Sequence, residues 1–173
     1  MIDRPKSSEY APFYSGYIDA VPVGNIFQTL EFQLDETLSL FQNITEDQSM
    51  LKYSEDKWTI KEVLGHIVDS EWIFSNRALR FSRSDQAELP GFDQDEYIYN
   101  ANFNKLSIKS ILDQFYHLRK ANLLLFKSFS KDQTLNIGIA NKNIISVRAI
   151  IYITSGHQKH HIDVLKERYL PLL

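Results

Sequence analysis

Composition limits the functions that this chain can perform. It has 173 residues, a formal net charge of −3 and no cysteine, which excludes disulfides, thiolate zinc sites and cysteine nucleophiles. Lys and Arg are scattered rather than clustered, so we expect no nucleic-acid partner. With 43% hydrophobic and 13% aromatic residues the chain can bury a full core, and we expect one domain over residues 1–173.

The chain shows no sign of export or of membrane insertion. Residues 1–6 contain no apolar signal segment, and the longest aliphatic runs, such as Ala149–Ile153, are far too short to span a bilayer. We therefore expect a cytoplasmic protein that does not bind membranes.

The first part of the chain predicts an ordered lead followed by a helix. Residues 1–23 are rich in Pro, Ser and Tyr, and we interpret them as coil that packs on the body of the protein. Alternatively, Tyr14 or Tyr17 reaches the mouth of a pocket. Apolar residues then recur at helical spacing over residues 25–41, which predicts the first long helix.

A second helix is predicted from a local start signal. Thr59 and Glu62 form a capping-box pattern, and helical apolar spacing continues to about Arg83. Residues 84–106 include an acidic cluster at 93–96. We interpret them as a long connection whose acidic side chains lie on the surface.

The second half of the chain predicts two more long helices and a small hairpin. One helix is expected over residues 107–129, and the last begins at Ser146, a residue type favoured at the N-cap. Between them, residues 134–139 and 143–145 flank a polar turn dipeptide, which predicts the hairpin. Four helices with long connections favour an all-α four-helix bundle with at least one crossover.

The last helix concentrates the histidines of the chain. Three of the five lie within residues 157–161. Along the apolar stripe that passes through Ile150, the next inward positions are His157 and His161, whereas His160 points off the stripe. Two inward imidazoles need hydrogen-bond partners or a metal, because an unpaired buried polar group costs about 1–3 kcal/mol.

A metal site needs at least one further ligand. His66 lies among apolar residues of the second helix, beside Gly65, which permits close approach of a neighbouring helix. It is a better candidate than His117, which lies off the apolar stripe of the third helix. Three neutral imidazoles on zinc or nickel leave an open position, the pattern of a catalytic site. In the alternative interpretation the histidines are core residues without a metal.

Other metal motifs are absent from the sequence. No histidine follows a glutamate by three positions, as in di-iron bundles, and no His-Glu-x-x-His segment occurs. Asp69 follows His66 by one helical turn. It is a candidate for a catalytic base or for a hydrogen-bond partner of a ligand imidazole, unless it is simply an exposed carboxylate.

Several motifs together resemble the DinB/YfiT-like superfamily over nearly the whole chain. They are Trp58–Glu71, Arg77–Phe81, Leu89–Asp93, and Gly156-His157 with His160-His161 before Glu167-Arg168-Tyr169. The resemblance implies an up-down-down-up bundle in which residues 84–106 cross between parallel helices. It also implies a metal held by His66, His157 and His161, with His160 not a ligand, and it allows a homodimer.

The resemblance implies two kinds of chemistry for one metal with an open position. Some family members transfer a low-molecular-weight thiol to an electrophile, and many are regarded as metal-dependent hydrolases. Our leading hypothesis is a thiol transferase acting on a small molecule, with hydrolysis as the alternative. A third hypothesis, from a different class, is a non-enzymatic bundle that binds a metal or ligand in a stress response.

Overall fold

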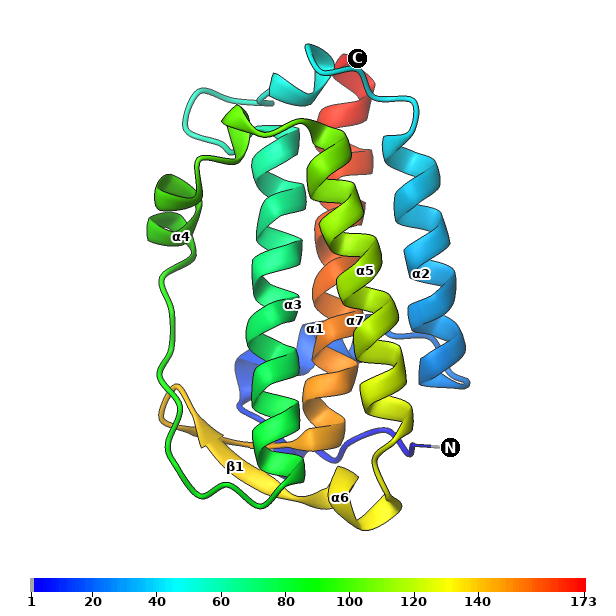
Figure 1. Cartoon of the computed structure of the whole chain (residues 1–173), viewed down its shortest axis with the longest axis vertical. Coiled ribbons are helices and arrows are strands. Elements are labelled where there is room, and N and C mark those ends of the chain that lie inside the picture. The colour runs from blue at the N-terminus through cyan, green and yellow to red at the C-terminus, as the bar shows by residue number, and fades with distance from the viewer. Residues whose placement is uncertain (1) are drawn as a thin grey trace.

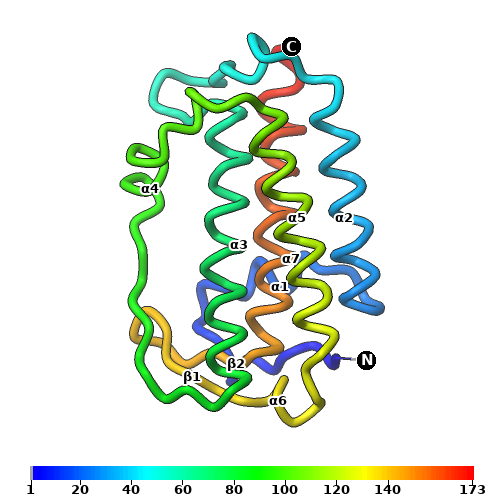
Figure 2. The backbone as a smooth tube through the Cα atoms, viewed as in Figure 1, coloured from blue at the N-terminus to red at the C-terminus, as the bar shows by residue number. Residues whose placement is uncertain are grey.

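The computed structural model describes residues 2–173 and confirms the four-helix bundle (Figure 1). The long helices are α2 (Ile26–Phe41), α3 (Ile60–Ser82), α5 (Ile108–Lys127) and α7 (Val147–Val164). In Figure 1, α2 and α7 run upward and α3 and α5 run downward. The connection from α3 to α5 therefore travels the length of the bundle beside α3, as the backbone trace in Figure 2 shows.

Shorter elements occupy the connections and the two ends of the bundle. They are η1 (Ser7–Glu9), η2 (Pro12–Tyr14), α1 (Ser15–Ala20), η3 (Gln48–Met50), α4 (Gln94–Ala101), η4 (Phe103–Lys105), α6 (Lys131–Leu135), β1 (Ile137–Ala140), β2 (Asn143–Ser146), η5 (Leu165–Tyr169) and η6 (Leu170–Leu172).

The predicted helix starts are present as hydrogen bonds. The Thr59 hydroxyl accepts from the Glu62 backbone N–H at 3.1 Å, and the Glu62 carboxylate accepts from the Thr59 N–H at 2.7 Å. Ser107 and Ser146 accept at 3.1 Å from backbone N–H groups in the first turns of α5 and α7. These caps satisfy N–H groups that the helices leave free, so the sequence signals were read correctly.

The predicted hairpin exists, but it is shorter than expected. Strands β1 and β2 pair antiparallel, and the turn residues Asn141 and Lys142 have φ of 49° and 62°, as a two-residue hairpin turn requires. Residues 134–135, predicted as strand, belong instead to α6. A capping box between Ser130 and Gln133 starts that short helix.

Two regions interpreted as coil contain helix. Within residues 84–106, the Asp93 carboxylate accepts from the backbone N–H groups of Asp95 and Glu96 and starts α4. Acidic side chains in a first helical turn also interact favourably with the helix dipole. Residues 2–23, the described part of the lead, are ordered, as expected, but 15–20 form α1 rather than coil.

Close approach of α1 to α7 depends on a glycine (Figure 1). A Cβ placed on Gly156 of α7 would lie 1.9 Å from the Tyr17 carbonyl oxygen of α1. Gly65 has a different neighbour from the helix that we expected. The ring of Phe103, from the short η4 near the end of the crossover, occupies the space that a Cβ there would need.

The hydrophobic core consists of two clusters, one toward each end of the bundle. One contains residues of α1, the second half of α3 and the first half of α7, and the other contains residues of the first halves of α3 and α5 and the end of α7. Polar side chains that are fully or almost fully buried lie at the level between them.

That polar layer joins all four long helices. Arg119 of α5 is 0% exposed, and its guanidinium donates to both carboxylate oxygens of Glu71 of α3 at 2.8 and 2.6 Å. It also donates to the Gln158 side-chain oxygen of α7 at 2.6 Å. Gln158 in turn donates to the Thr37 hydroxyl and the Gln33 carbonyl of α2 at 2.7 and 3.0 Å.

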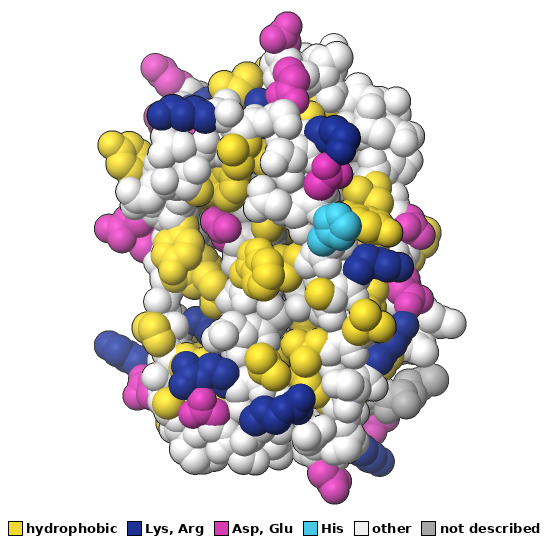
Figure 3. Space-filling view, in the orientation of Figure 1, with side chains coloured by type: hydrophobic (Ala, Val, Ile, Leu, Met, Phe, Trp, Pro, Cys, Tyr) yellow, Lys and Arg dark blue, Asp and Glu magenta, His cyan; other side chains and the backbone are white. Residues whose placement is uncertain are grey.

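Within residues 2–173, no helix is both long and apolar enough to cross a bilayer. On the face drawn in Figure 3, hydrophobic side chains gather toward the middle, and acidic and basic side chains are interspersed around them.

Substitution of Gly156 tests the packing of α1 on α7. We expect Gly156→Ala to lower the free energy of unfolding by about 1–3 kcal/mol, because the new methyl group overlaps the Tyr17 backbone. Gly16→Ala in α1 is the control, since a Cβ there has nothing within 4 Å. Chemical denaturation of both variants measures the difference. Equal stability of the two would contradict the close approach.

Candidate metal centre

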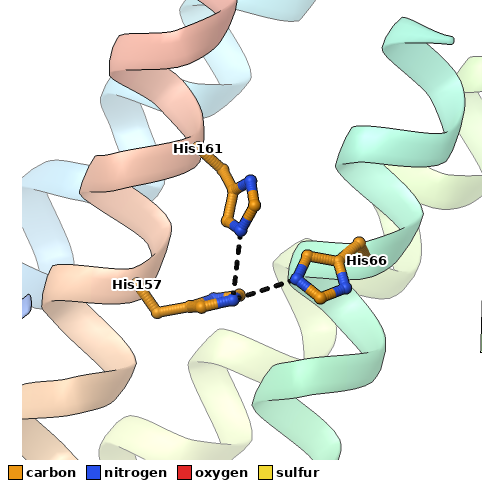
Figure 4. Close-up of side chains that lie close together, drawn as sticks. All are labelled: His66, His157 and His161. Atoms are coloured by element: carbon orange, nitrogen blue, oxygen red, sulfur yellow. Dashed lines mark hydrogen bonds between the residues drawn. The ribbon is translucent and has the colours of Figure 1, made fainter. Parts of the chain in front are cut away.

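Three imidazoles from two helices converge on one point near the middle of the bundle (Figure 4). His66 is in α3, and His157 and His161 are one turn apart in α7. The His157 Nε2 atom lies 3.0 Å from His66 Nε2 and 3.2 Å from His161 Nε2. His66 and His157 are buried, and His161 is half-buried. The structure therefore brings together the three histidines singled out in the sequence.

Aromatic side chains surround the imidazoles. The Trp58 ring centroid lies 4.8 Å from that of His66, and Phe74 and Tyr17 approach His157 edge-on at 5.5 Å. These rings exclude water from much of the site. They also limit rotation of the imidazoles, so the nitrogen atoms are held in position before any ligand binds.

Burial keeps the three imidazoles neutral at physiological pH. It lowers the pKa of His66 to about 4 and that of His161 to about 3, and it holds the pKa of His157 well below its ordinary value. The neighbouring imidazoles add to this effect, because two positive charges so close would repel. Neutral imidazoles are the form that ligates metals.

Hydrogen bonding alone does not satisfy this arrangement well. A ring nitrogen carries either one N–H or one lone pair, so His157 Nε2 can form a good hydrogen bond with only one of its two neighbours. A cation accepts all three lone pairs at once. Nitrogen atoms about 2.0–2.1 Å from a tetrahedral metal lie about 3.3 Å apart, close to the separations seen here. The three residues thus fit a divalent metal ion.

The centre opens toward a cavity of about 410 Å³ at the α7 side. His161 belongs both to the imidazole group and to the cavity wall. The other lining residues are Tyr53, Asp56, Lys57, Trp58, Val63, Gln94, Asp95, His160, Val164 and Tyr169. Charged groups of both signs therefore face a space that is large enough for a small molecule.

The remaining candidates from the sequence occupy different positions. His117 is exposed on α5, as expected, and His160 is exposed beside the cavity. Asp69 is half-buried one turn after His66, and burial raises its pKa to about 6. The Ser70 hydroxyl, to which sequence reasoning gave no role, lies 3.5 Å from His66 Nε2.

Of the aromatic neighbours, sequence reasoning named only Tyr17, as an alternative to packing, and it missed the polar layer behind the imidazoles. Trp58 precedes α3 and gave no periodic signal. Glu71, however, lies on the same stripe of α3 as Leu64 and Phe74, both of which are buried. A carboxylate on an apolar stripe indicates that a buried partner pairs with it. This signal was visible in the sequence.

A family model settles the relationship of the chain to known proteins. Residues 29–165 match the model of the DinB superfamily. The chain belongs to the DinB superfamily. The match contains all three imidazoles of the centre, together with the four long helices apart from the first residues of α2.

A solved structure has the same fold. It is YfiT from Bacillus subtilis, described as a probable metal-dependent hydrolase with an unusual four-helix bundle topology. The two structures superpose with a TM-score of 0.71 at 16% sequence identity, over 99% of this chain and 94% of that chain. Curated protein sequences compared with this DinB chain show no match to it.

The depressed pKa of His66 predicts acid sensitivity of the metal-free protein. His66 takes up a proton near pH 6.5 in the unfolded chain but only near pH 4 in the folded one. The unfolded state therefore binds more protons in this interval, and the free energy of unfolding falls as the pH drops from about 6.5 to about 4.

Paired substitutions isolate that effect. His66→Gln should make the free energy of unfolding less dependent on pH in this interval, whereas His117→Gln, at an exposed site, should leave the dependence unchanged. Urea denaturation of chelator-treated protein at several pH values measures both. The same pH dependence in His66→Gln as in the parent protein would show that His66 does not titrate abnormally.

Proposed function

We propose that the protein is a metal-dependent enzyme with one divalent ion, zinc or nickel, bound by His66, His157 and His161. The observation that carries the proposal is the convergence of three neutral imidazole nitrogens beside a cavity. Ligation by nitrogen alone suits either metal. Three protein ligands leave one coordination position of the metal open for a substrate atom. An open position of this kind distinguishes catalytic from structural metal sites.

The favoured reaction is transfer of a low-molecular-weight thiol to an electrophilic small molecule. A divalent ion at this centre supplies Lewis acidity, which lowers the pKa of a thiol or of water. The S–H proton passes to a base, the sulfur electron pair attacks the electrophilic carbon, and the leaving group departs with its bonding electrons. Cavity residues of both charges, such as Lys57 and Asp56, suit a thiol cosubstrate that carries ionised groups.

Asp69 is the proposed proton acceptor. It lies one turn from His66 on α3, and its pKa of about 6 is high enough for useful proton affinity while leaving the carboxylate ionised at pH 7. The half-buried position keeps it in reach of solvent, so the proton can leave after each turnover.

Hydrolysis of a small substrate is the second candidate. The description of YfiT as a probable metal-dependent hydrolase favours it, because the two proteins share the fold. Water would replace the thiol as nucleophile, and Asp69 would accept a proton from oxygen instead of sulfur. In a non-enzymatic metal-binding bundle, by contrast, the cavity and Asp69 would have no role in turnover.

Metal content tests the centre directly. We expect about one divalent ion per chain in untagged protein, and much less in His66→Ala, His157→Ala and His161→Ala, since each removes one of three ligands. His117→Ala and His160→Ala are the controls, because neither residue belongs to the imidazole group. Elemental analysis gives the stoichiometry. Unchanged metal content in the three variants would refute the site.

Activity assays separate the two reactions. Consumption of a small thiol with an electrophilic test compound, abolished by a chelator and restored by metal, is the expected result. Hydrolysis of an ester or amide without thiol would favour the second candidate, and neither reaction in metal-loaded protein would favour a non-enzymatic role.

The same assays test Asp69. Asp69→Asn should lower kcat by roughly 10²–10⁴-fold and remove the fall in rate below about pH 6 that protonation of this carboxylate causes. Asp113→Asn, on the exposed surface of α5, should leave the rate unchanged. A parental rate and pH profile in Asp69→Asn would exclude Asp69 as the base.

A further inference from the structure

The crossover runs beside α3 (Figure 1). Residues of both segments line a second cavity. Its volume is about 500 Å³. The lining residues are Trp72, Ile73, Asn76, Arg77 and Arg80 of α3 and Leu89, Pro90, Gly91, Phe92 and Tyr97 of the crossover. Aromatic rings and aliphatic groups form most of this wall, and the two arginines are its only ionised side chains.

Arg77 differs from the other buried arginines of residues 2–173. Arg119 and Arg148 are each paired with a carboxylate, that of Glu71 and that of Glu9 respectively. Arg77 is 4% exposed and forms no ion pair within the described chain. It is therefore a buried cation without a counter-charge.

The polar neighbours of Arg77 are neutral. Its guanidinium donates to the Pro90 carbonyl at 2.7 Å. Burial lowers the pKa of Arg77, and the groups that act in the opposite direction are the phenols of Tyr14 and Tyr97. Arg80, on the same wall, is already paired with Asp85 at 2.6 Å. One guanidinium on this cavity therefore keeps its charge uncompensated.

We propose that this cavity binds an organic carboxylate with an aromatic or apolar body, and that the Arg77 guanidinium holds the carboxylate group. The planar guanidinium matches a carboxylate in geometry and can donate two parallel hydrogen bonds to it. The rings of Trp72, Phe92 and Tyr97 would enclose the body of the ligand. A buried cation without a partner is costly, and an anionic ligand removes that cost.

The proposed site is separate from the imidazole centre and does not depend on the proposed function. His66 and Arg77 are eleven residues apart on α3, which corresponds to about 16 Å along a helix axis. None of the residues that line this cavity belongs to the imidazole group or to the cavity beside it.

A purely structural role for Arg77 makes a different prediction. Its bond to Pro90 fixes the crossover against α3, and this would need no ligand. A clamp of that kind does not distinguish a carboxylate from its neutral amide analogue. Binding of such a matched pair to the unmodified protein therefore separates the two roles without relying on a variant.

The test is a titration with phenylacetate and with phenylacetamide, followed by backbone amide NMR signals of Leu89, Gly91 and Phe92 and by calorimetry. We expect saturable binding of phenylacetate and at least roughly tenfold weaker binding of phenylacetamide, which corresponds to loss of one charge-assisted contact. Arg77→Gln should remove this preference, and Arg83→Gln, at the exposed end of α3, should keep it.

Each further outcome has a definite meaning. Equal binding of the two probes, or no binding to the folded unmodified protein, would overturn the proposal. Signals that respond to inorganic phosphate but not to phenylacetate would show that the ligand class is wrong. The preference for phenylacetate should persist in metal-free protein and in His66→Ala. Failure of the proposed metal centre would therefore leave this test unaffected.

Discussion

The buried ion pair between Glu71 and Arg119 is the interaction on which the bundle depends most. Both side chains are at most 2% exposed, and they lie between two hydrophobic clusters that have no polar groups to offer. Removing one partner of such a pair costs about 3–5 kcal/mol, because the other charge stays buried. Its bonds continue through Gln158 to α2, so the pair determines how α3, α5 and α7 face one another. His157 is the neighbour of Gln158 in α7, and the geometry of the imidazoles follows from that alignment.

Local signals in the sequence were enough for the long helices and for the imidazole group. A capping box at Thr59, an N-cap at Ser146 and apolar periodicity depend on residues three or four positions apart, and the sequence displays such spacings directly. The buried position of His66 and the exposed position of His117 followed from the same kind of signal, since the stripe of each helix shows which face is buried. The pairing of Glu71 with Arg119 has no such local pattern, because the two residues are 48 positions apart.

The short elements were harder to predict, because contacts between residues far apart in the sequence determine some of their positions. Helix α1 has no side-chain cap, and its position depends on the absence of a side chain at Gly156, far away in the sequence. Helix α4 did have a local signal, since Asp93 caps a first turn that contains two acidic residues. We missed it because a cluster of acids also fits an exposed loop, and composition does not distinguish the two. The ring of Phe103 on Gly65 is a second such tertiary contact, made by a residue near the end of the crossover.

Polar groups inside this bundle fall into two classes, and the difference between them bears on function. Members of the layer around Glu71 bond to one another, so they stabilise the fold without a ligand. The imidazoles of the metal centre meet only like groups, so they cannot all pair with one another. The guanidinium of Arg77 meets no carboxylate, so its charge is not paired. Folded proteins tolerate such locally unfavourable arrangements mainly where a ligand compensates them. His66 and Arg77 both lie on α3, one before and one after Glu71, so the layer that fixes this helix also fixes the positions of these two side chains.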